Sequence, residues 1–323
     1  MADTISEISV AVVSFNTREL TLRGLASAQR AVGGLRASLT LVDNGSSDGT
    51  VGAVERDFPQ WRIMSLPDNP GYGAALNRAF ADAPAKYYLA LNSDVLIDAP
   101  AVRALCTYLD DHPSCGLAAP ALLYPDGRAQ PTAKRIQSLP FAVGEVLEFH
   151  ALASRNRWVR RFYYLDRDLS KAQDVEAVSG AVLLIKGEAY RRIGGFDEGF
   201  RLYFEETDLC IRLRRAGYDI AFVPDAQAVH VHGASTSQTT MRRVEYYVSY
   251  VRLLRKHRGG VSARVLAAVV MVRTFIQMVG LVVKYPPISS VRASMLVARL
   301  AACGRLLRAL WTPPSIRQGA VLR

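Results

Sequence analysis

Cysteine is scarce in this chain, and its four cysteines lie far apart, at Cys106, Cys115, Cys210 and Cys303. No two of them form a CxxC pair, which argues against a zinc ribbon or a disulfide framework and fits a reducing compartment. The opening residues lack a basic region followed by an apolar stretch, so we expect no signal peptide. With 50% hydrophobic and 21% charged residues, the sequence is typical of a globular protein rather than a disordered one.

Acidic residues are nearly missing from the end of the chain. Residues 241–323 hold 15 Lys or Arg and one acid, Glu245, whereas residues 1–240 hold 25 basic and 28 acidic residues. The formal net charge of +11 therefore comes from the tail. A basic tail favours nucleic acid or an anionic membrane surface as partner. Because this tail is rich in Val, Leu, Ala and Met, with few aromatic residues beyond its first helix, the sequence favours the membrane and predicts no nucleic-acid contact.

Short apolar runs alternate with helical segments in the first part of the chain. Strands are predicted at 8–15, 38–42, 61–66 and 87–91. Helices are predicted at 17–31, at 73–83 and at 100–113, and a further helix follows the turn-rich loop at 43–49 and ends at about residue 58. This alternation predicts an α/β fold with a mostly parallel sheet covered by helices on both faces. Ligands of such sheets bind at the carboxyl ends of the strands, where Ser14, Asn16, Asp43 and Asp94 converge.

The regular alternation fades further along the chain. Residues 120–175 mix Pro, Arg and aromatic residues, which predicts loops and short helices over the sheet edge. A later strand is interrupted at Ser179-Gly180-Ala181, where we expect a ligand or another backbone to come close. The elements predicted after residue 170 are that strand at 174–186, a helix at 205–216 and strands at 220–224 and 228–232.

Three carboxylates crowd into four residues, Glu205, Glu206 and Asp208, between the apolar Phe204 and Leu209. Like charges packed against apolar walls are unfavourable unless a metal, a cationic substrate or a proton transfer offsets the repulsion. The alternative is a solvated acidic helix start, which the helix dipole stabilises. Alone, the cluster favours that second interpretation; together with the other motifs it favours the first.

Two loops offer groups that suit a phosphate-bearing ligand. Asn92-Ser93-Asp94 follows a strand directly, where a carboxylate is a natural ligand for a hard divalent cation, although the same residues also favour a β-turn. Asn69 to Arg78 is a glycine-bearing loop that opens a helix and can bring backbone N–H groups or Arg78 near a phosphate. That loop lacks the dinucleotide and Walker A patterns, so an ordinary loop-to-helix junction is an equal alternative.

His230 and His232 lie on one face of a predicted strand. Single histidines are more often core or surface residues than metal ligands. Here His230 follows the acidic cluster closely enough for both to meet at one cleft, and with Asp94 it would make a mixed N/O site suited to Mn²⁺ or Mg²⁺.

Taken in order, these motifs resemble glycosyltransferase family 2, the inverting, metal-dependent nucleotide-sugar transferases of GT-A fold. The motifs are Ser14-x-Asn16, Asp43, Asn69-x-Gly71-x-Gly73, Asn92-x-Asp94, Ser179-Gly180-Ala181, Gly194-Gly195-Phe196-Asp197-Glu198, Glu205-Glu206-x-Asp208-Leu209 and His230-x-x-Gly233-x-Ser235. The resemblance covers about residues 8–257 and is strongest to bacterial rhamnosyltransferase-type members. It implies a GT-A (Rossmann-like) three-layer sandwich with a mixed, mostly parallel sheet over residues 1–260, followed by a basic helical tail over 261–323.

The resemblance also implies roles for individual residues. It implies a metal held by Asp94 and His230, with His232 the second choice, and Asn92 stands where the family often has Asp. It implies Glu206 as the catalytic base where the family usually has Asp, which leaves Glu205 and Asp208 as alternatives. The nucleotide-sugar-binding positions are Ser14, Asn16, Asp43, Asn69, Gly71, Asn77, Arg78, Asn92, Ser93, Gly180 and Ala181.

The function implied is transfer of a sugar, rhamnose from dTDP-rhamnose, to a cell-envelope glycan or polyprenyl-linked acceptor, in the cytoplasm or on the inner face of the membrane. One alternative is a nucleotidyltransferase, but the segment from Ser14 to Arg18 lacks the glycine-rich loop usual there. The other is a non-catalytic membrane- or nucleic-acid-binding protein on a degenerate GT-A fold. The presence of Asp94, Glu206 and His230 together counts against degeneracy.

The tail contains an apolar stretch of 19 residues between Arg264 and Lys284. That is close to the ~20 residues of a spanning helix. Arg273 and Gln277 share one face, and a charge near the bilayer centre is unfavourable, so we expect a helix in the membrane interface with that face outward. A second helix is predicted over 291–311, after Pro286-Pro287. The alternative is that both helices pack on the catalytic domain or on a second subunit, as in a homodimer.

Overall fold

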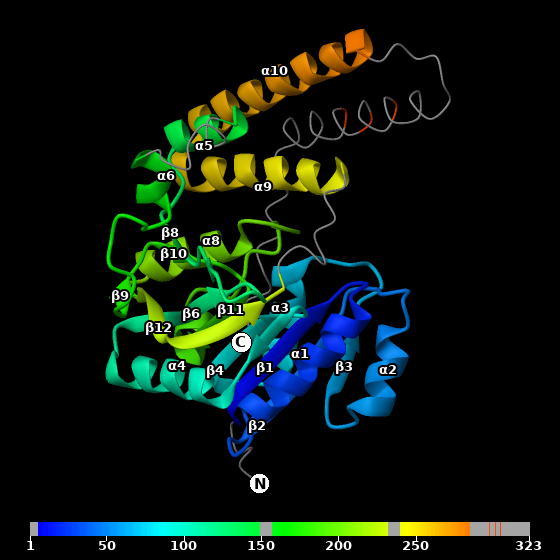
Figure 1. Cartoon of the computed structure of the whole chain (residues 1–323), viewed down its shortest axis with the longest axis vertical. Helices are drawn as coiled ribbons and strands as arrows, with labels where there is room; N and C mark the ends of the chain where they lie inside the picture. Colours follow the sequence, from blue (N-terminus) through cyan, green and yellow to red (C-terminus); the bar gives the residue numbers. More distant parts are fainter. Residues whose placement is uncertain are drawn as a thin grey trace.

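The computed structural model describes residues 6–148, 157–231 and 240–284, with a few single positions beyond them. A twisted central sheet is covered by helices on both faces, and two long helices lie beyond this sandwich, at the top of the view in Figure 1.

The main strands are β1 Ser6–Ser14, β2 Ala37–Asp43, β3 Arg62–Ser65, β4 Ala85–Asn92, β5 Val95–Ile97, β6 Cys115–Leu123, β11 Val182–Lys186 and β12 Asp219–His230. Short strands are β7 Ala129–Gln130, β8 Ala133–Lys134, β9 Gln173–Asp174 and β10 Ala177–Val178. The helices are α1 Arg18–Ala31, α2 Thr50–Asp57, α3 Tyr72–Asp82, α4 Ala99–Asp111, α5 Leu139–Val146, α6 Arg157–Phe162, α7 Gly187–Arg192, α8 Glu205–Arg215, α9 Thr240–Arg258 and α10 Gly260–Lys284.

The main strands follow the order β3-β2-β1-β4-β11-β6-β12-β5. The first four are parallel, β11 is antiparallel to both neighbours, and β5 is antiparallel to β12. Because β1 lies between β2 and β4, the sheet has a topological switch point there, where α/β sheets bind ligands. Ser14 lies opposite Asp43, and Val13 lies opposite Asn92, so the predicted convergence of these strand ends is confirmed.

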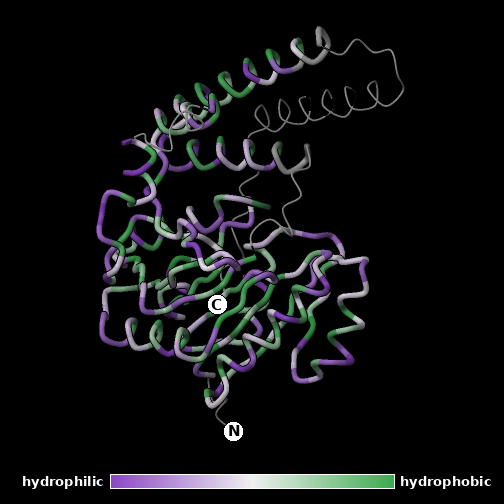
Figure 2. The backbone as a smooth tube through the Cα atoms, in the orientation of Figure 1, coloured by the Kyte–Doolittle hydropathy of each residue, from purple (hydrophilic) through white to green (hydrophobic). Residues whose placement is uncertain are grey.

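The two faces of the sheet bury separate sets of apolar side chains, because successive residues of a strand point to opposite faces. In β1, Ile8 and Val10 pack toward Leu25 of α1, whereas Ala11 packs toward Leu76 of α3. Figure 2 shows the hydrophobic residues concentrated in these central strands. The result is the three-layer arrangement of a GT-A fold.

A third apolar cluster joins the long helices to the rest of the protein. Tyr250 of α9 packs with Leu266 and Val270 of α10 and with Ala142 of α5. Phe204, which immediately precedes α8, belongs to the same cluster. The helices after residue 240 are therefore anchored beside the acidic helix.

Two predictions about the later strands are wrong. Strand β6 spans Cys115–Leu123, although we predicted no strand between the one at 87–91 and the one at 174–186, because its run of small residues contains Pro120. The proline is accommodated beside a shift of register in β12 between Val223 and Gln227. That shift also explains why two strands were predicted where the structure has the single strand β12.

The predicted tail helix is confirmed as α10, whereas its place in a membrane interface with the Arg273 face outward stays a prediction. The Arg273 side chain is 15% exposed and contacts Glu148 and the Tyr247 hydroxyl. In the part of the chain that the structure describes, one helical stretch is long and apolar enough to cross a membrane, Gly260–Gln277, with 22% of it buried. The predicted helix at 291–311 and His232 lie outside the continuously described residues.

Candidate active site

Asp94 and His230 come together because β5 and β12 pair. His230 lies opposite Val95, and the Val231 N–H donates to the Asp94 carbonyl oxygen over 2.9 Å. The imidazole Nε2 consequently lies 3.3 Å from Asp94 Oδ1, and both side chains are more than nine-tenths buried. The pairing of two strands that are far apart in the sequence thus brings together the carboxylate oxygen and the imidazole nitrogen of the predicted metal site.

Gln130 orients the His230 ring. Its amide nitrogen donates to the carbonyl oxygens of His230 and Leu123, so its oxygen must face His230 Nδ1, 3.0 Å away. An oxygen there accepts the Nδ1 proton, which leaves the lone pair on Nε2, the atom facing Asp94. This is the arrangement in which imidazole binds a cation through Nε2.

These two side chains fit a divalent cation by their chemistry. A carboxylate oxygen and an oriented imidazole nitrogen suit Mn²⁺, and also Mg²⁺ where substrate phosphates and water complete the shell. Among residues 6–148, 157–231 and 240–284, no group of three His, Cys, Asp or Glu side chains is arranged to hold a metal.

Asp43 has one carboxylate oxygen without a partner. Its Oδ2 accepts hydrogen bonds from the N–H groups of Gly45 and Ser46 at 3.2 and 2.8 Å. Its Oδ1 is buried and finds no hydrogen-bond partner among the described residues. A buried acceptor without a partner is unfavourable, so a donor from a ligand would be bound strongly there.

Other predicted nucleotide positions hold the strand ends in place. Asn16, at a φ of 51°, accepts the Ser47 N–H through its side-chain oxygen at 2.8 Å. Buried hydroxyls join Ser14 to Thr21 at 2.8 Å and Ser93 to Thr17 at 2.9 Å. These contacts fix the turn after β1 against the loop after β4.

The loop before α3 approaches the acidic region through its backbone. Asn69 and Gly71 both have positive φ, and a Cβ on Gly71 would lie 2.1 Å from the Arg201 carbonyl oxygen. Only glycine allows this approach. It brings Tyr72 into the site, where the hydroxyl donates to the Gly180 carbonyl oxygen over 3.0 Å.

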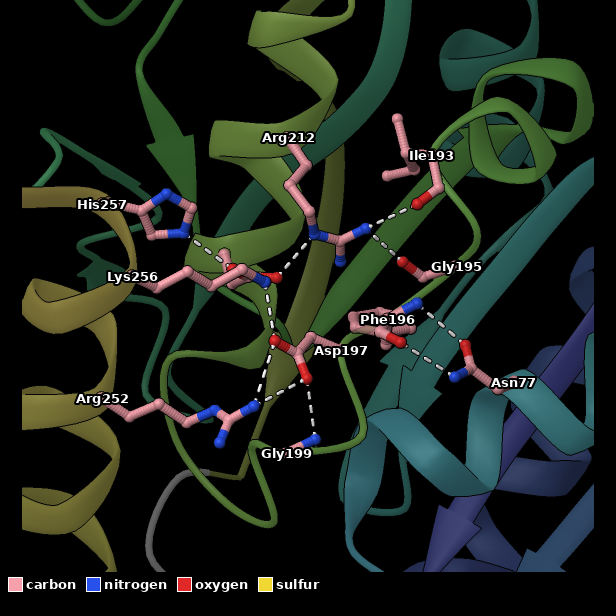
Figure 3. A network of polar contacts seen from close by, with 11 residues as sticks. Asn77, Ile193, Gly195, Phe196, Asp197, Gly199, Arg212, Arg252, Lys256 and His257 are labelled. Carbon is pink, nitrogen blue, oxygen red and sulfur yellow. Dashed lines mark hydrogen bonds and ion pairs between the residues drawn. The ribbon is translucent and has the colours of Figure 1, made fainter. Parts of the chain in front are cut away.

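Asn77 is hydrogen-bonded within the protein, whereas Arg78 is exposed. The Asn77 amide oxygen accepts from the Phe196 N–H, and its nitrogen donates to the Phe196 carbonyl oxygen (Figure 3). The same oxygen also accepts from the Tyr190 hydroxyl, and the nitrogen also donates to Glu198. All four hydrogen-bonding positions of the amide are used within the protein. Arg78 is exposed on α3.

Glu205 and Glu206 form the first turn of α8. The two residues before them, Tyr203 and Phe204, both have left-handed backbones, with φ of 68° and 67°. Such a conformation is strained in a non-glycine residue and concentrates at functional sites. The bend places Glu206 beside Gly180, whose Cβ, if present, would lie 3.3 Å from Glu206 Cβ.

Glu206 has a cationic partner that the sequence did not indicate. Lys134 of β8 forms an ion pair with Glu206 Oε1, and the Thr207 hydroxyl donates to the same oxygen over 3.0 Å. Both ion-pair side chains are largely buried, with 17% and 10% exposure. The contact holds the carboxylate in place.

The surroundings of Glu205 favour its protonated form. Burial, reinforced by the charge of Glu206, raises the pKa of the Glu205 carboxyl to about 8. Its Oε2 is buried without a hydrogen-bond partner among the described residues. At neutral pH Glu205 therefore keeps its proton beside the charged Glu206.

Asp208 faces away from the other two acids. Its side chain is fully buried and contacts Arg212 Nε, Lys256 Nζ and His257 Nε2 at 2.7, 2.6 and 2.7 Å. Burial opposes its ionisation, but these cationic and hydrogen-bonding partners outweigh burial and hold the pKa of Asp208 well below its usual range. Asp208 thus joins α8 to α9.

Tyr72 shows that the separate parts share one site. Burial, together with the charges of Glu205, Glu206 and Asp94, holds the pKa of Tyr72 well above its ordinary value. The Asn92 N–H donates to the Ala181 carbonyl oxygen over 3.0 Å, which places the interrupted strand against the end of β4. The structure therefore brings the acidic pair, Asp94 and the Gly180 segment together around one phenol.

This fold is that of the GT-A class of glycosyltransferases. Two family descriptions match the sequence, "Glycosyl transferase family 2" over residues 9–194 and "Glycosyl transferase family group 2" over residues 128–313. The chain belongs to glycosyltransferase family 2. It is an enzyme of that family and not a nucleotidyltransferase or a degenerate binding protein.

Known proteins similar to this chain agree with the assignment. The N-acetylglucosaminyl-diphospho-decaprenol L-rhamnosyltransferase of Mycobacterium tuberculosis is 30% identical over 235 residues, which is 69% of this chain and 76% of the relative. Among solved structures, the mannosyltransferase PcManGT from Pyrobaculum calidifontis, with GDP-Man and Mn²⁺, has a TM-score of 0.55 at 16% identity, covering 96% of this chain and 88% of that one. GalNAc-T7 with UDP, GalNAc and Mn²⁺ also has a TM-score of 0.55, at 13% identity, covering 78% and 48%.

Proposed function

We propose that this enzyme transfers rhamnose from dTDP-rhamnose, with inversion, to a polyprenyl-diphosphate-linked sugar of the cell envelope. The rhamnosyl activity in the name of the Mycobacterium tuberculosis relative supports the donor, and the decaprenol-linked sugar in that name supports the acceptor class. The observation that carries the proposal is the Gly180-Ala181 segment, which lies against Glu206 and Tyr72 on one side and against the end of β4, close to the Asp94–His230 pair, on the other.

In this proposal, Asp94 Oδ1 and His230 Nε2 hold a divalent cation, and Gln130 keeps the His230 ring in the binding tautomer. When bound, the cation would neutralise charge on the leaving nucleoside diphosphate. The structures of PcManGT and GalNAc-T7 with Mn²⁺ support a metal of this kind.

The transfer is a single displacement at the anomeric carbon. The acceptor hydroxyl oxygen forms the new bond to this carbon, and the diphosphate oxygen leaves from the opposite face with the bonding electron pair. Glu206 takes the proton from the acceptor hydroxyl. Glu206 is the better base because Lys134 and Thr207 hold its Oε1 in place, whereas Glu205 keeps its own proton at pH 7.

The nucleotide half of the donor lies along the ends of β1 and β2 in this proposal. Asp43 Oδ1, the buried acceptor without a partner, would receive a donor group of the nucleoside. Asn16, Asn69, Gly71, Arg78, Asn92 and the Gly180-Ala181 segment line the same region. Ser14, Ser93 and Asn77 support it from behind, because their side chains are engaged within the protein.

A donor screen tests this function. Release of dTDP, UDP or GDP from the matching sugar donors is followed with Mn²⁺, with Mg²⁺ and with EDTA, in the presence of a short prenyl-diphosphate-linked N-acetylglucosamine. We expect release of dTDP from dTDP-rhamnose that requires both metal and acceptor. Faster turnover of a UDP or GDP donor would overturn the rhamnose assignment, and full activity in EDTA would overturn the metal site.

We further propose that residues 1–260 form the catalytic domain and that the tail holds the enzyme on the inner face of the membrane. The face of α10 opposite its packed side exposes apolar residues at helical spacing, Val261, Val265, Val272, Phe275 and Ile276. The basic excess of the tail suits an anionic lipid surface. A second copy of the chain is the alternative occupant of this face.

A further inference from the structure

The acidic helix α8 is tied to α9 by a set of charged side chains, of which Asp208 and His257 are buried. We call Arg252, Lys256 and His257 of α9 the α9 basic cluster. Its members contact two carboxylates, Asp208 in the first turn of α8 and Asp197 in the loop that precedes it (Figure 3).

Lys256 bridges the two carboxylates. Its Nζ lies 2.6 Å from Asp197 Oδ2 and 2.6 Å from Asp208 Oδ1. Arg252 adds a contact of 3.1 Å to Asp197, and both cations lie over the buried ring of Phe200. One ammonium group thus joins α9 to the start of α8 and to the loop before it.

The loop that contains Asp197 is fixed on its other sides as well. Arg212 of α8 donates to the carbonyl oxygens of Ile193 and Gly195 at 3.0 and 2.6 Å. Asn77 of α3 holds Phe196 through its N–H and its carbonyl oxygen. The loop therefore connects α3, α8 and α9, and a shift of any of the three would move the others.

The burial of Asp208 makes this connection necessary. A fully buried carboxylate is strongly unfavourable without cationic partners, and two of its three partners come from α9. When α9 moves away, Asp208 must turn toward solvent or take up a proton. Either change disturbs the first turn of α8, which carries Glu205 and Glu206.

We propose that Lys256 is a positioning residue for sugar transfer, which makes α9 part of the catalytic apparatus. It acts through Asp197 and Asp208 and holds Glu206 at the distance and angle from the acceptor hydroxyl that proton transfer requires. This inference rests on the proposed function of Glu206. Errors of about 1 Å in such placement lower rates by about 100-fold.

Lys256→Met tests the inference, because it keeps most of the side-chain length and removes the charge. Arg258→Met is the matched control, since Arg258 is an exposed cation at the end of the same helix. At a temperature where both variants are folded, we expect Lys256→Met to lose about 10- to 100-fold in kcat with the donor KM unchanged. Lys256→Arg, which keeps a cation, should restore most of the rate.

A double-mutant cycle with Asp197→Asn separates positioning from general weakening. If Lys256 acts through Asp197, the two losses in kcat will be far from additive. Additive losses, a kcat for Lys256→Met within twofold of that for Arg258→Met, or a loss expressed only in the donor KM would each overturn the inference.

Hydrogen exchange gives a readout that needs no sugar donor. We expect amides of residues 203–210 to exchange faster in Lys256→Met than in the wild type, and not in Arg258→Met. Unchanged exchange would overturn the positioning role. Absence of transfer in the wild type would count against the proposed function instead, and exchange would still decide whether Lys256 holds α8.

Discussion

Lys134, from the two-residue strand β8, and Glu206, from the first turn of α8, form an ion pair at the centre of the site. With Glu205 beside it, Glu206 belongs to a pair of buried carboxyls that share one lysine. The protein thereby separates the two acids by protonation state, since Glu205 keeps its proton to a pKa of about 8.

Lys134→Met should lower kcat, because it removes the ammonium group that holds Glu206 Oε1 in place. We expect a loss of about 10- to 100-fold in kcat with nucleotide affinity kept, the range for a catalytic group displaced by about 1 Å. Steady-state kinetics measures it, and Lys171→Met, at an exposed lysine, is the control. A kcat equal to that of the control would show that Lys134 does not position the base.

Glu206→Gln should lose roughly 10²–10⁴ in kcat while nucleotide affinity is kept, because the amide keeps the shape but accepts no proton. Asp208→Asn should instead destabilise the fold by about 3–5 kcal/mol, since it breaks a buried charged network. Steady-state kinetics and thermal unfolding distinguish the two. An active Glu206→Gln beside a folded but inactive Asp208→Asn would move the base assignment to Asp208.

The acid stability of the protein should depend on Asp208. Its pKa is lowered in the folded state, so its contribution is complete above the ordinary value of 3.8 and is lost as the pH falls below that value. Thermal unfolding between pH 2.5 and 6 should show a steeper fall below pH 4 in the wild type than in Asp208→Asn. Parallel curves would contradict the ionic role of this carboxylate.

Glu205→Gln should stabilise the protein increasingly as the pH rises. The unfolded chain releases this proton near 4.5, whereas the folded protein holds it to about 8, so the wild type loses stability across that window. The gain in Tm of the variant should therefore be small at pH 5, grow to pH 8 and then level off. A gain independent of pH would mean that the effect is one of packing.

Asp94→Ala should abolish Mn²⁺-dependent nucleotide binding with little change in Tm. Gln130→Leu should weaken Mn²⁺ binding by about 10- to 100-fold, because the ring of His230 loses the partner that sets its tautomer. Calorimetric titration of Mn²⁺ with dTDP present measures both. Equal Mn²⁺ affinity in Gln130→Leu and the wild type would remove Gln130 from the site.

Replacing Phe275 and Ile276 by Ser should release the protein from anionic liposomes without lowering its activity on a water-soluble acceptor. Both side chains are more than 60% exposed, whereas truncation of α10 would also remove the buried Leu266 and Val270. Sedimentation with liposomes at low salt tests membrane binding, and light scattering tests the alternative of a dimer. Unchanged sedimentation together with a shift from dimer to monomer would assign this face to a second subunit.

The site residues that could be predicted from the sequence follow directly after a strand with a recognisable apolar pattern. Asp43 and Asp94 follow apolar strands, and the end of a strand in a parallel sheet is a defined place in space. The acidic residues of α8 were visible because like charges seldom crowd beside apolar side chains. The alternation of strands and helices likewise predicted the sandwich.

Lys134, Gln130 and Lys256 were not predictable in the same way. Lys134 and Gln130 belong to two-residue strands in a stretch without periodicity, and Lys256 is one of several cations on a basic helix. Their roles depend on pairing between distant segments, which leaves no local pattern. Tyr72 had a weak signal, its place between Gly71 and Gly73 in a loop that opens a helix.

The strained left-handed backbone at the consecutive residues Tyr203 and Phe204 implies a trade-off between thermal stability and turnover. A substitution elsewhere in this segment that let the bend straighten would relieve backbone strain and let α8 begin along a straighter path. The same relaxation would turn Glu206 away from Gly180. Selection or engineering for heat resistance should therefore tend to accept changes here that slow the enzyme, and variants chosen for speed should keep the strained bend.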